Sequence, residues 1–190
     1  FWCAGYRRLP NGGGIVVELY ESADGFDWSR QKVVANGNEC AMIPWCDGAL
    51  RAFVRTKGKP GHMQIWESRA PFGTWRQLGT IPKIIQAPHL ERLGDDVYLF
   101  GREVPPAGAD GRKPPSALRR TRIWRIRGAK AEEVLTMPSS GDTSYVGTAL
   151  RPDGLLLVSY YGQHEAVDPD PAHDDPNNKP ADVFVAGIEW

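Results

Sequence analysis

The 190-residue sequence has little of several features that define common classes of protein. It has three cysteines, an odd number and too few for a disulfide framework. Its 23 basic side chains are balanced by 23 acidic ones, so it lacks the net positive charge by which proteins attract nucleic acid. No purely apolar run exceeds four residues, whereas a membrane-spanning helix needs about 18. These absences argue against a disulfide scaffold, a nucleic-acid partner and a membrane span, and predict a soluble protein.

The cysteine spacing also argues against a bridge or a structural zinc site. If Cys40 and Cys46 lie on one extended strand, six steps of about 3.3 Å place them about 20 Å apart, beyond disulfide reach. Neither these two nor Cys3 belongs to a CxxC pair. We therefore expect thiols that pack in the core and no metal bound by them.

Glycine and proline, by contrast, are abundant, with 21 and 16 residues, and aromatic residues make up 10% of the chain. Glycine and proline in such numbers interrupt long helices and favour tight turns. The composition therefore predicts many short strands joined by turns, and it is not that of a helical bundle.

An internal repeat runs through the sequence. The motif Tyr6-Arg7-Arg8 recurs as Phe53-Val54-Arg55 and again as Phe100-Gly101-Arg102, and equivalent positions lie 47 residues apart each time. Trp28 and Trp75 have the same separation. Two independent features therefore share one period.

A second motif supports the repeat farther along the chain. Cys46-Asp47-Gly48-Ala49-Leu50 recurs as Pro152-Asp153-Gly154-Leu155-Leu156 at an offset of 106, which is two periods plus 12 residues. We assign the extra residues to the proline- and glycine-rich segment 105–115. A repeat of 40 to 50 residues with about four strands is typical of a β-propeller blade. The sequence thus predicts an all-β fold, a β-propeller of four-stranded antiparallel blades.

The blades can be delimited from the repeat. We predict a partial blade at 1–35, complete blades at 36–82 and 83–138, and a closing blade at 139–190, which is about 3.5 blades in one chain. About fourteen strands are expected, at 1–8, 15–21, 27–34, 40–46, 50–55, 63–68, 74–78, 87–93, 97–103, 121–126, 133–135, 145–150, 155–161 and 183–188. Closed propellers need at least four blades, so this chain is expected not to close alone.

The sequence opens on Phe1-Trp2-Cys3, inside a predicted strand and without a methionine or a signal peptide. The compartment therefore cannot be inferred. We expect the missing blades to come from another polypeptide or from self-association.

Propeller geometry brings particular residues together at one mouth. The loops that enter strand one and leave strand two of every blade emerge on the same face. The repeat places Glu39, Gln86 and Tyr145 at the first of these positions, and Arg8, Arg55, Arg102 and Tyr161 at the second. The alternative interpretation is that these arginines face solvent or pair with neighbouring acids.

Two sets of residues resemble the sialidase superfamily. Ser22-Ala23-Asp24-Gly25-Phe26-Asp27-Trp28 looks like the Asp-box turn (BNR repeat) of sialidase propellers, and 68–75 looks like a degenerate copy. Asn38-Glu39 with Asp47-Gly48 and Arg55 resembles one sialidase blade, and 141–145 with 159–165 resembles the closing blade. The resemblance implies the C-terminal part of a six-bladed whole.

The resemblance also implies a mechanism. It makes Tyr145 the nucleophile, Glu39 its base partner, and Arg55 and Arg102 two arms of a clamp for a sugar carboxylate. A neutral phenol suits this chemistry because a sialoside carries a carboxylate on its anomeric carbon, which would repel an acidic nucleophile. The phenol needs a neighbouring base, since its ordinary pKa is about 10.

The match is incomplete. The family's third clamp arginine and its acid/base aspartate have no motif-matched counterpart here, so we expect the isolated chain to lack sialidase activity. Arg8, Asp142, Gln86, Tyr161 and His164 remain candidate residues for binding the sugar.

Three further possibilities remain. The proline-rich loop at 166–180 carries Asp168, Asp170, Asp174 and Asp175, whose oxygens could bind Ca²⁺ or could simply be solvated. The protein could also be a non-catalytic glycan-binding propeller, with Trp2 and Trp45 contributing to its mouth, or a propeller fragment that another chain completes. Apart from this Ca²⁺, no cofactor is expected.

Overall fold

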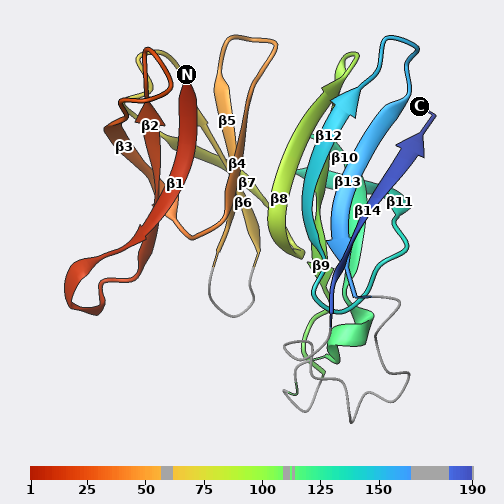
Figure 1. The fold of residues 1–190 in the computed structure, drawn as a ribbon. Helices are drawn as coiled ribbons and strands as arrows, with labels where there is room; N and C mark the ends of the chain where they lie inside the picture. Colours follow the sequence, from red (N-terminus) through yellow and green to blue (C-terminus); the bar gives the residue numbers. More distant parts are fainter. Residues whose placement is uncertain (57–61, 109–111, 113, 164–179, 190) are drawn as a thin grey trace. The chain divides into compact units, whose positions relative to one another are not determined.

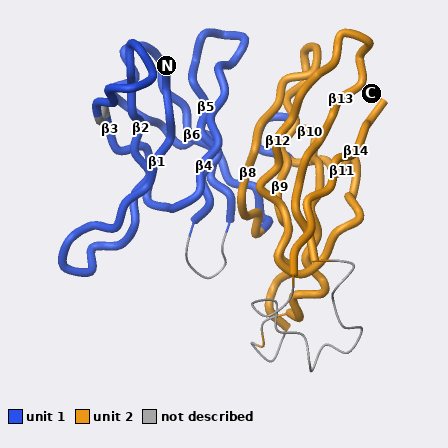
Figure 2. Tube along the Cα trace, in the orientation of Figure 1, with its two compact units in different colours: residues 1–83, 127–130 blue, residues 84–126, 131–190 orange. Residues whose placement is uncertain are grey.

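The computed structural model describes residues 1–56, 62–108, 112, 114–163 and 180–189. In this part of the chain the fold is all-β, as predicted. Fourteen strands form four antiparallel sheets, and the two helical segments are single 3-10 turns, η1 (Pro10–Gly12) and η2 (Ser116–Leu118) (Figure 1). The chain divides into two compact units, residues 1–83 with 127–130 and residues 84–126 with 131–190 (Figure 2).

The first unit contains a three-stranded and a four-stranded sheet. The three-stranded sheet has the order β1 (Trp2–Arg8), β2 (Ile15–Glu21) and β3 (Ser29–Asn36). The four-stranded sheet has the order β4 (Cys40–Pro44), β5 (Leu50–Arg55), β6 (Met63–Ser68) and β7 (Arg76–Ile81). Alternate residues of the central strands pack into one core, which includes Val17, Leu19, Ala52 and Val54. The two sheets stay together because this face of each is apolar.

The second unit repeats this organisation in reverse order. Its four-stranded sheet has the order β11 (Lys130–Thr136), β10 (Arg120–Arg127), β9 (Asp96–Val104) and β8 (Ile84–Leu93). Its three-stranded sheet has the order β12 (Ser144–Leu150), β13 (Leu156–Gly162) and β14 (Asp182–Ile188). Its core contains Phe100, Ile123, Leu156 and Val158, all with no exposed surface.

The repeated Asp-Gly motif forms the same turn in both units. Asp47 Oδ1 accepts the N–H of Ala49 at 3.1 Å, and Asp153 Oδ1 accepts that of Leu155 at 3.2 Å. The glycine that follows each aspartate has a positive φ, 79° and 87°, which a side chain would disfavour. In each unit this turn joins the first strand of a sheet to the second, so the offset of 106 residues corresponds to a real structural equivalence.

The turn between β2 and β3 is built from side-chain hydrogen bonds. Ser22 Oγ accepts the N–H of Gly25 at 2.8 Å, and Asp24 Oδ1 accepts those of Phe26 and Asp27 at 2.8 and 3.0 Å. These bonds, strongest from the Phe26 N–H, hold the pKa of Asp24 below its ordinary value. Serine and aspartate side chains thus satisfy the backbone N–H groups of this turn.

We expect Asp24→Ala to lower the free energy of unfolding by about 1 kcal/mol, because two backbone N–H groups lose their acceptor. Urea unfolding followed by tryptophan fluorescence would measure the change. The control is Asp27→Ala in the same turn, since the carboxylate that accepts these two N–H groups is that of Asp24. An equal effect of both substitutions would contradict the assignment.

Trp28, at the end of this turn, is 43% exposed, and its Nε1 donates to the carbonyl of Gly25 at 3.0 Å. Some local predictions were wrong. Cys3 and Cys46 are exposed rather than in the core, whereas burial raises the pKa of the Cys40 thiol. The strand predicted at 87–93 begins at Ile84, because a bulge lets pairing continue past the position where the alternation of the sequence breaks.

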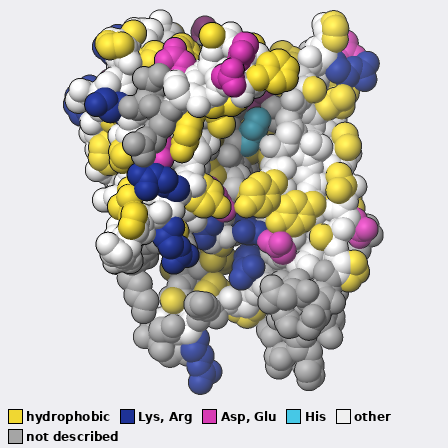
Figure 3. Space-filling model, turned by 60° about the vertical axis from the view of Figure 1, so that its left-hand side comes forward, with side chains coloured by type: hydrophobic (Ala, Val, Ile, Leu, Met, Phe, Trp, Pro, Cys, Tyr) yellow, Lys and Arg dark blue, Asp and Glu magenta, His cyan; other side chains and the backbone are white. Residues whose placement is uncertain are grey.

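The surface carries charges of both signs. On the face drawn in Figure 3, basic, acidic and hydrophobic side chains are all exposed. This agrees with the formal net charge of zero. No helix in the described part of the chain is long and apolar enough to cross a membrane.

Candidate functional site

The second unit places a buried arginine at the end of β9. Arg102 is 8% exposed, and its Nε and Nη2 donate to Gln86 Oε1 at 3.1 and 2.7 Å. Its Nη1 donates to the Thr143 carbonyl at 3.0 Å and to Asp142 Oδ1. Three of the candidate residues, Arg102, Gln86 and Asp142, therefore meet in one network. A buried guanidinium is stable here because a carboxylate and two neutral acceptors surround it.

Gly101 makes room for this network. A Cβ at Gly101 would lie 2.6 Å from Ile85 Cγ2 and 3.0 Å from the Gln86 carbonyl oxygen. Glycine thus allows β8 to approach β9 closely beside Arg102.

Two β-bulges lie at the start of the first strands of the two sheets. In β8 the register shifts between Gln86 and His89, and in β12 it shifts between Ser144 and Gly147. Each bulge contains a residue with positive φ. In β8 it is Ala87, with a φ of 49°; in β12 it is Tyr145, with a φ of 47°, and the preceding Ser144 also has a positive φ, 110°. Left-handed φ is rare for an aromatic residue and costs about 1–3 kcal/mol, and such strain is commonest at functional sites.

The register corrects one predicted equivalence. Gln86 pairs with Arg102 and Ser144 pairs with Tyr161. Ser144, and not Tyr145, is therefore the counterpart of Gln86, and Tyr145 corresponds to Ala87. Ser144 is fully buried, and its Oγ has no hydrogen-bond partner within the described structure.

Tyr145 is the exposed member of the site. Its side chain is 62% exposed and its ring stacks on that of Tyr161, with centroids 6.1 Å apart and an interplanar angle of 15°. Burial, followed by the neighbouring Asp142 carboxylate, raises the pKa of Tyr161 to about 12. Tyr161 therefore stays a neutral phenol at physiological pH and can support Tyr145 without competing as a nucleophile.

The first unit contains the other predicted pair. Arg55 Nη1 donates to Glu39 Oε2 at 2.8 Å, and the side chains are 21% and 14% exposed. The backbone joins them too, because the Arg55 N–H donates to the Glu39 carbonyl at 2.8 Å. Arg55, which the resemblance assigned to the carboxylate clamp, is thus paired with a neighbouring acid. That pairing is the alternative interpretation that the sequence analysis gave for these arginines. The role of Glu39 as base partner of Tyr145 stays a prediction.

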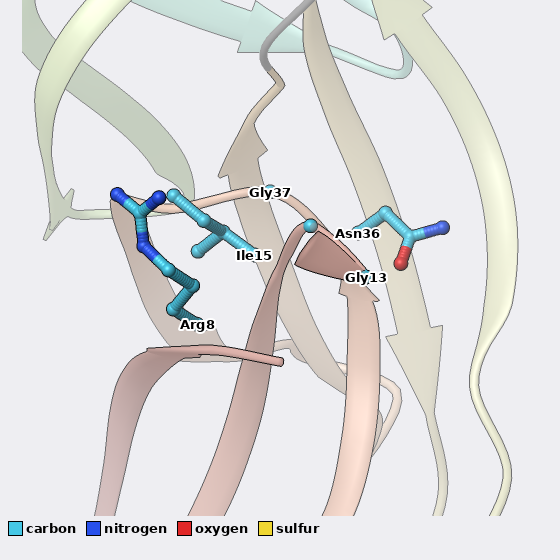
Figure 4. Close-up of a pocket in the computed structure, with 6 residues that line it drawn as sticks. Arg8, Gly13, Ile15, Asn36 and Gly37 are labelled. Atoms are coloured by element: carbon cyan, nitrogen blue, oxygen red, sulfur yellow. The ribbon is translucent and has the colours of Figure 1, made fainter. Parts of the chain in front are cut away.

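Arg8, at the end of β1, borders a pocket of about 470 Å³ in the first unit (Figure 4). Its guanidinium lies beside the side chain of Ile15, while the Asn36 amide points away from it. Gly13, Gly14 and Gly37 complete the lining. Arg8 is exposed and has no ion-pair partner among the described residues, so it differs from Arg55 and Arg102.

A second polar chain links β8 to β12. His89 Nε2 lies 2.8 Å from Thr148 Oγ1, and Thr148 Oγ1 donates to Glu91 Oε2. Since the single hydroxyl proton goes to Glu91, His89 Nε2 must be the donor to Thr148. The sequence analysis did not identify this chain, because the bulges set which residues of β8 and β12 face each other.

We expect the pKa of His89 to lie below 6.5, because burial disfavours its charged form while Glu91 only partly opposes that effect. Glu91→Gln should lower it further by removing the nearby negative charge. Titration of the imidazole resonances by NMR would measure both values. A rise in the midpoint of the variant would show that Glu91 does not act on the ring.

The remaining predictions lie outside the described residues. His164 and the candidate calcium ligands Asp168, Asp170, Asp174 and Asp175 fall in the segment that the structure does not describe. Elsewhere in the described ranges, no group of three or more histidine, cysteine, aspartate or glutamate side chains could hold a metal ion.

Comparisons with known proteins place the fold. No protein-family profile and no curated protein matches the sequence. Among solved structures, phage phi92 endosialidase has a TM-score of 0.64 at 14% identity, over 98% of this chain and 33% of the other. The GH93 α-L-arabinofuranosidase of Fusarium graminearum has a TM-score of 0.64 at 10% identity, over 98% and 62%. Penicillium chrysogenum α-L-arabinanase has 0.60 at 11%, over 95% and 65%.

These likenesses define the class of fold. The structural neighbours are glycoside hydrolases with β-propeller folds, and the chain spans between a third and about two thirds of their length. The fold is therefore a partial β-propeller of the kind found in glycosidases.

Proposed function

We propose that this chain forms the C-terminal part of a sialidase-like glycoside hydrolase, which cleaves a terminal acidic sugar with retention of configuration through Tyr145. The observation that carries the proposal is the position of Tyr145, which is exposed, backbone-strained and stacked on Tyr161. It follows by two residues Thr143, whose carbonyl accepts a hydrogen bond from the buried Arg102. A bulge that aims one side chain outward costs stability, and such strain is commonest at functional sites. The glycosidase folds of the structural neighbours support the same class of reaction.

The proposed reaction assigns a role to each described residue. The Tyr145 oxygen attacks the anomeric carbon while the bond to the leaving group breaks, and the base that the resemblance assigns to Glu39 takes the phenolic proton. The leaving oxygen takes its proton from an acid that this chain does not supply. Arg102 and Arg55 attract the sugar carboxylate. To bind it, Arg102 would give up hydrogen bonding to Asp142, and Arg55 would give up hydrogen bonding to Glu39. Water then releases the sugar from the tyrosine.

The test requires an assembly with a complete set of blades. Native mass spectrometry on the purified protein first identifies every polypeptide that accompanies the chain. That assembly is then incubated with a 3-fluorosialosyl fluoride, in which the phenolate displaces fluoride and the ring fluorine slows hydrolysis of the product. We expect a peptide containing Tyr145 to gain the mass of the fluorosugar.

The controls separate the alternatives. An aryl arabinofuranoside tests the neutral substrates that some structural neighbours' names suggest. Turnover of this compound, with no labelling by the fluorosialoside, would overturn the acidic-sugar assignment.

A non-catalytic glycan-binding propeller is the second candidate, and the Tyr145–Tyr161 stack favours it, because an exposed aromatic face can bind a sugar without reacting. Binding of the sialoside with neither labelling nor turnover would select this function.

A further inference from the structure

We infer that the two bulges of the second unit are tied together at both ends, and that the His89–Thr148–Glu91 chain is a positioning device that fixes the orientation of Tyr145. The consequence for turnover rests on the proposed function, whereas the orientation of Tyr145 does not. His89, Thr148 and Glu91 do not reach the sugar in the proposed reaction, so we assign them no catalytic role.

The first tie lies where the bulges begin. Arg102 donates from one side of its guanidinium to Gln86, the first residue of the β8 bulge. From the other side it donates to Asp142 and to the carbonyl of Thr143, immediately before the β12 bulge. One rigid planar group therefore holds both starting points in a fixed relation.

Thr143 strengthens this end. It is fully buried, its Oγ1 donates to the Tyr161 carbonyl at 2.6 Å, and it lies 2.8 Å from Thr121 Oγ1. Thr143, which precedes the bulge, is thus bonded through its carbonyl to β9 and through its hydroxyl to β10 and β13.

The second tie lies where the bulges end. His89 is the last residue of the β8 bulge, and Thr148 follows Gly147, the last residue of the β12 bulge. The hydrogen bond between them joins the two strands, and Glu91, two residues beyond His89, completes the chain from the same strand. Phe100 holds the imidazole from the side, edge to face at 5.8 Å.

The hydrogen bonds at both ends hold a strained stretch of backbone in place. Ser144 and Tyr145 both have φ in the left-handed region, and Ser144 Oγ makes no compensating hydrogen bond within the described structure. An unsupported bulge would relax towards extended backbone, which moves the Tyr145 side chain to the other face of the strand. Bonds on both sides of the bulge resist that change.

The experiment reads the orientation of Tyr145 directly. Tyrosines are replaced by 3-fluorotyrosine in the 190-residue chain, and the ¹⁹F resonance of Tyr145 is identified by its loss in Tyr145→Phe. Thr148→Val removes the hydroxyl with little change in shape, and should shift or broaden the Tyr145 resonance. Thr148→Ser restores the hydroxyl and should restore the resonance.

A matched control uses the same substitution elsewhere. Thr136→Val also breaks a threonine-to-glutamate hydrogen bond, that of Thr136 to Glu133 on β11, and should leave the Tyr145 resonance unchanged. His89→Gln, which keeps a donor near the Nε2 position, should perturb the resonance less than His89→Leu. These variants keep the test informative should Thr148→Val fail to fold.

In an assembly that turns over the sialoside, Thr148→Val should lower kcat about 10- to 100-fold with KM changed less than about twofold, because misplacement by about an ångström affects the reacting atoms more than binding. An unchanged Tyr145 resonance in Thr148→Val would overturn the inference whatever the turnover. A shifted resonance in a protein without turnover would retain the inference and reject the proposed function.

Discussion

Tyr145→Phe is expected to lower turnover of an aryl sialoside by about 10³-fold in the complete assembly, with the dissociation constant changed less than about threefold. Phenylalanine keeps the stacking face towards Tyr161 but has no oxygen to attack the anomeric carbon. A loss confined to kcat identifies an interaction that acts in the reaction and not in binding. Initial rates and saturation-transfer NMR on the same preparation would give both numbers.

Two further variants make the result specific. Tyr161→Phe should retain most of the turnover, because Tyr161 supports the stack with a phenol that burial keeps protonated. Tyr145→Ala should weaken binding as well, since it removes the aromatic face. If Tyr145→Phe turns over the substrate at the wild-type rate while Tyr145→Ala no longer binds the sugar, Tyr145 acts in sugar binding alone.

Arg102→Met is expected to lower the free energy of unfolding by about 3 kcal/mol. Methionine fills much of the volume but makes none of the bonds to Gln86, Asp142 and the Thr143 carbonyl. The buried Thr143 carbonyl and the partly buried Gln86 amide oxygen therefore lose their donor. The half-exposed Asp142 can return to water, which limits the loss. Urea unfolding of the 190-residue chain would measure the effect.

The control for this prediction is Arg151→Met in the same unit. Arg151 pairs with Asp153 at 2.7 Å, but both side chains are about half exposed, at 51% and 55%. Exposed pairs contribute roughly 0–1 kcal/mol, so this change should be small. Similar effects of the two substitutions would mean that the Arg102 network does not stabilise the fold.

The strand architecture could be predicted from the sequence because its signals are local. The Asp-Gly turns at 47–48 and 153–154 need one side-chain acceptor and one glycine with positive φ, and both are visible as residue types. The period of 47 residues aligned the arginines at the ends of β1, β5 and β9, and the offset of 106 residues, two periods plus 12, aligned the two turns. Fold class and strand count therefore followed from spacing alone.

The site was harder to predict because bulges do not show in spacing. A bulge inserts one unpaired residue, so counting from Glu39 and Gln86 placed Tyr145 where the register places Ser144. Partner choice was also hidden: Arg55 bonds to Glu39 across the strand pair, and Arg102 bonds to an aspartate 40 residues away. Sequence spacing identifies which arginines recur but not which acceptors they meet.

The close approach at Gly101 has a consequence for sequence variation. Any side chain there would push against Ile85 and the Gln86 carbonyl, and so would displace the residue that holds two nitrogens of Arg102. A position without a functional group would then be as intolerant of substitution as the arginine beside it. In a saturation library of this unit, substitutions at Gly101 should therefore impair folding as much as substitutions in the polar network do. At the strained but outward-facing Tyr145, many residues should allow folding and few should allow activity.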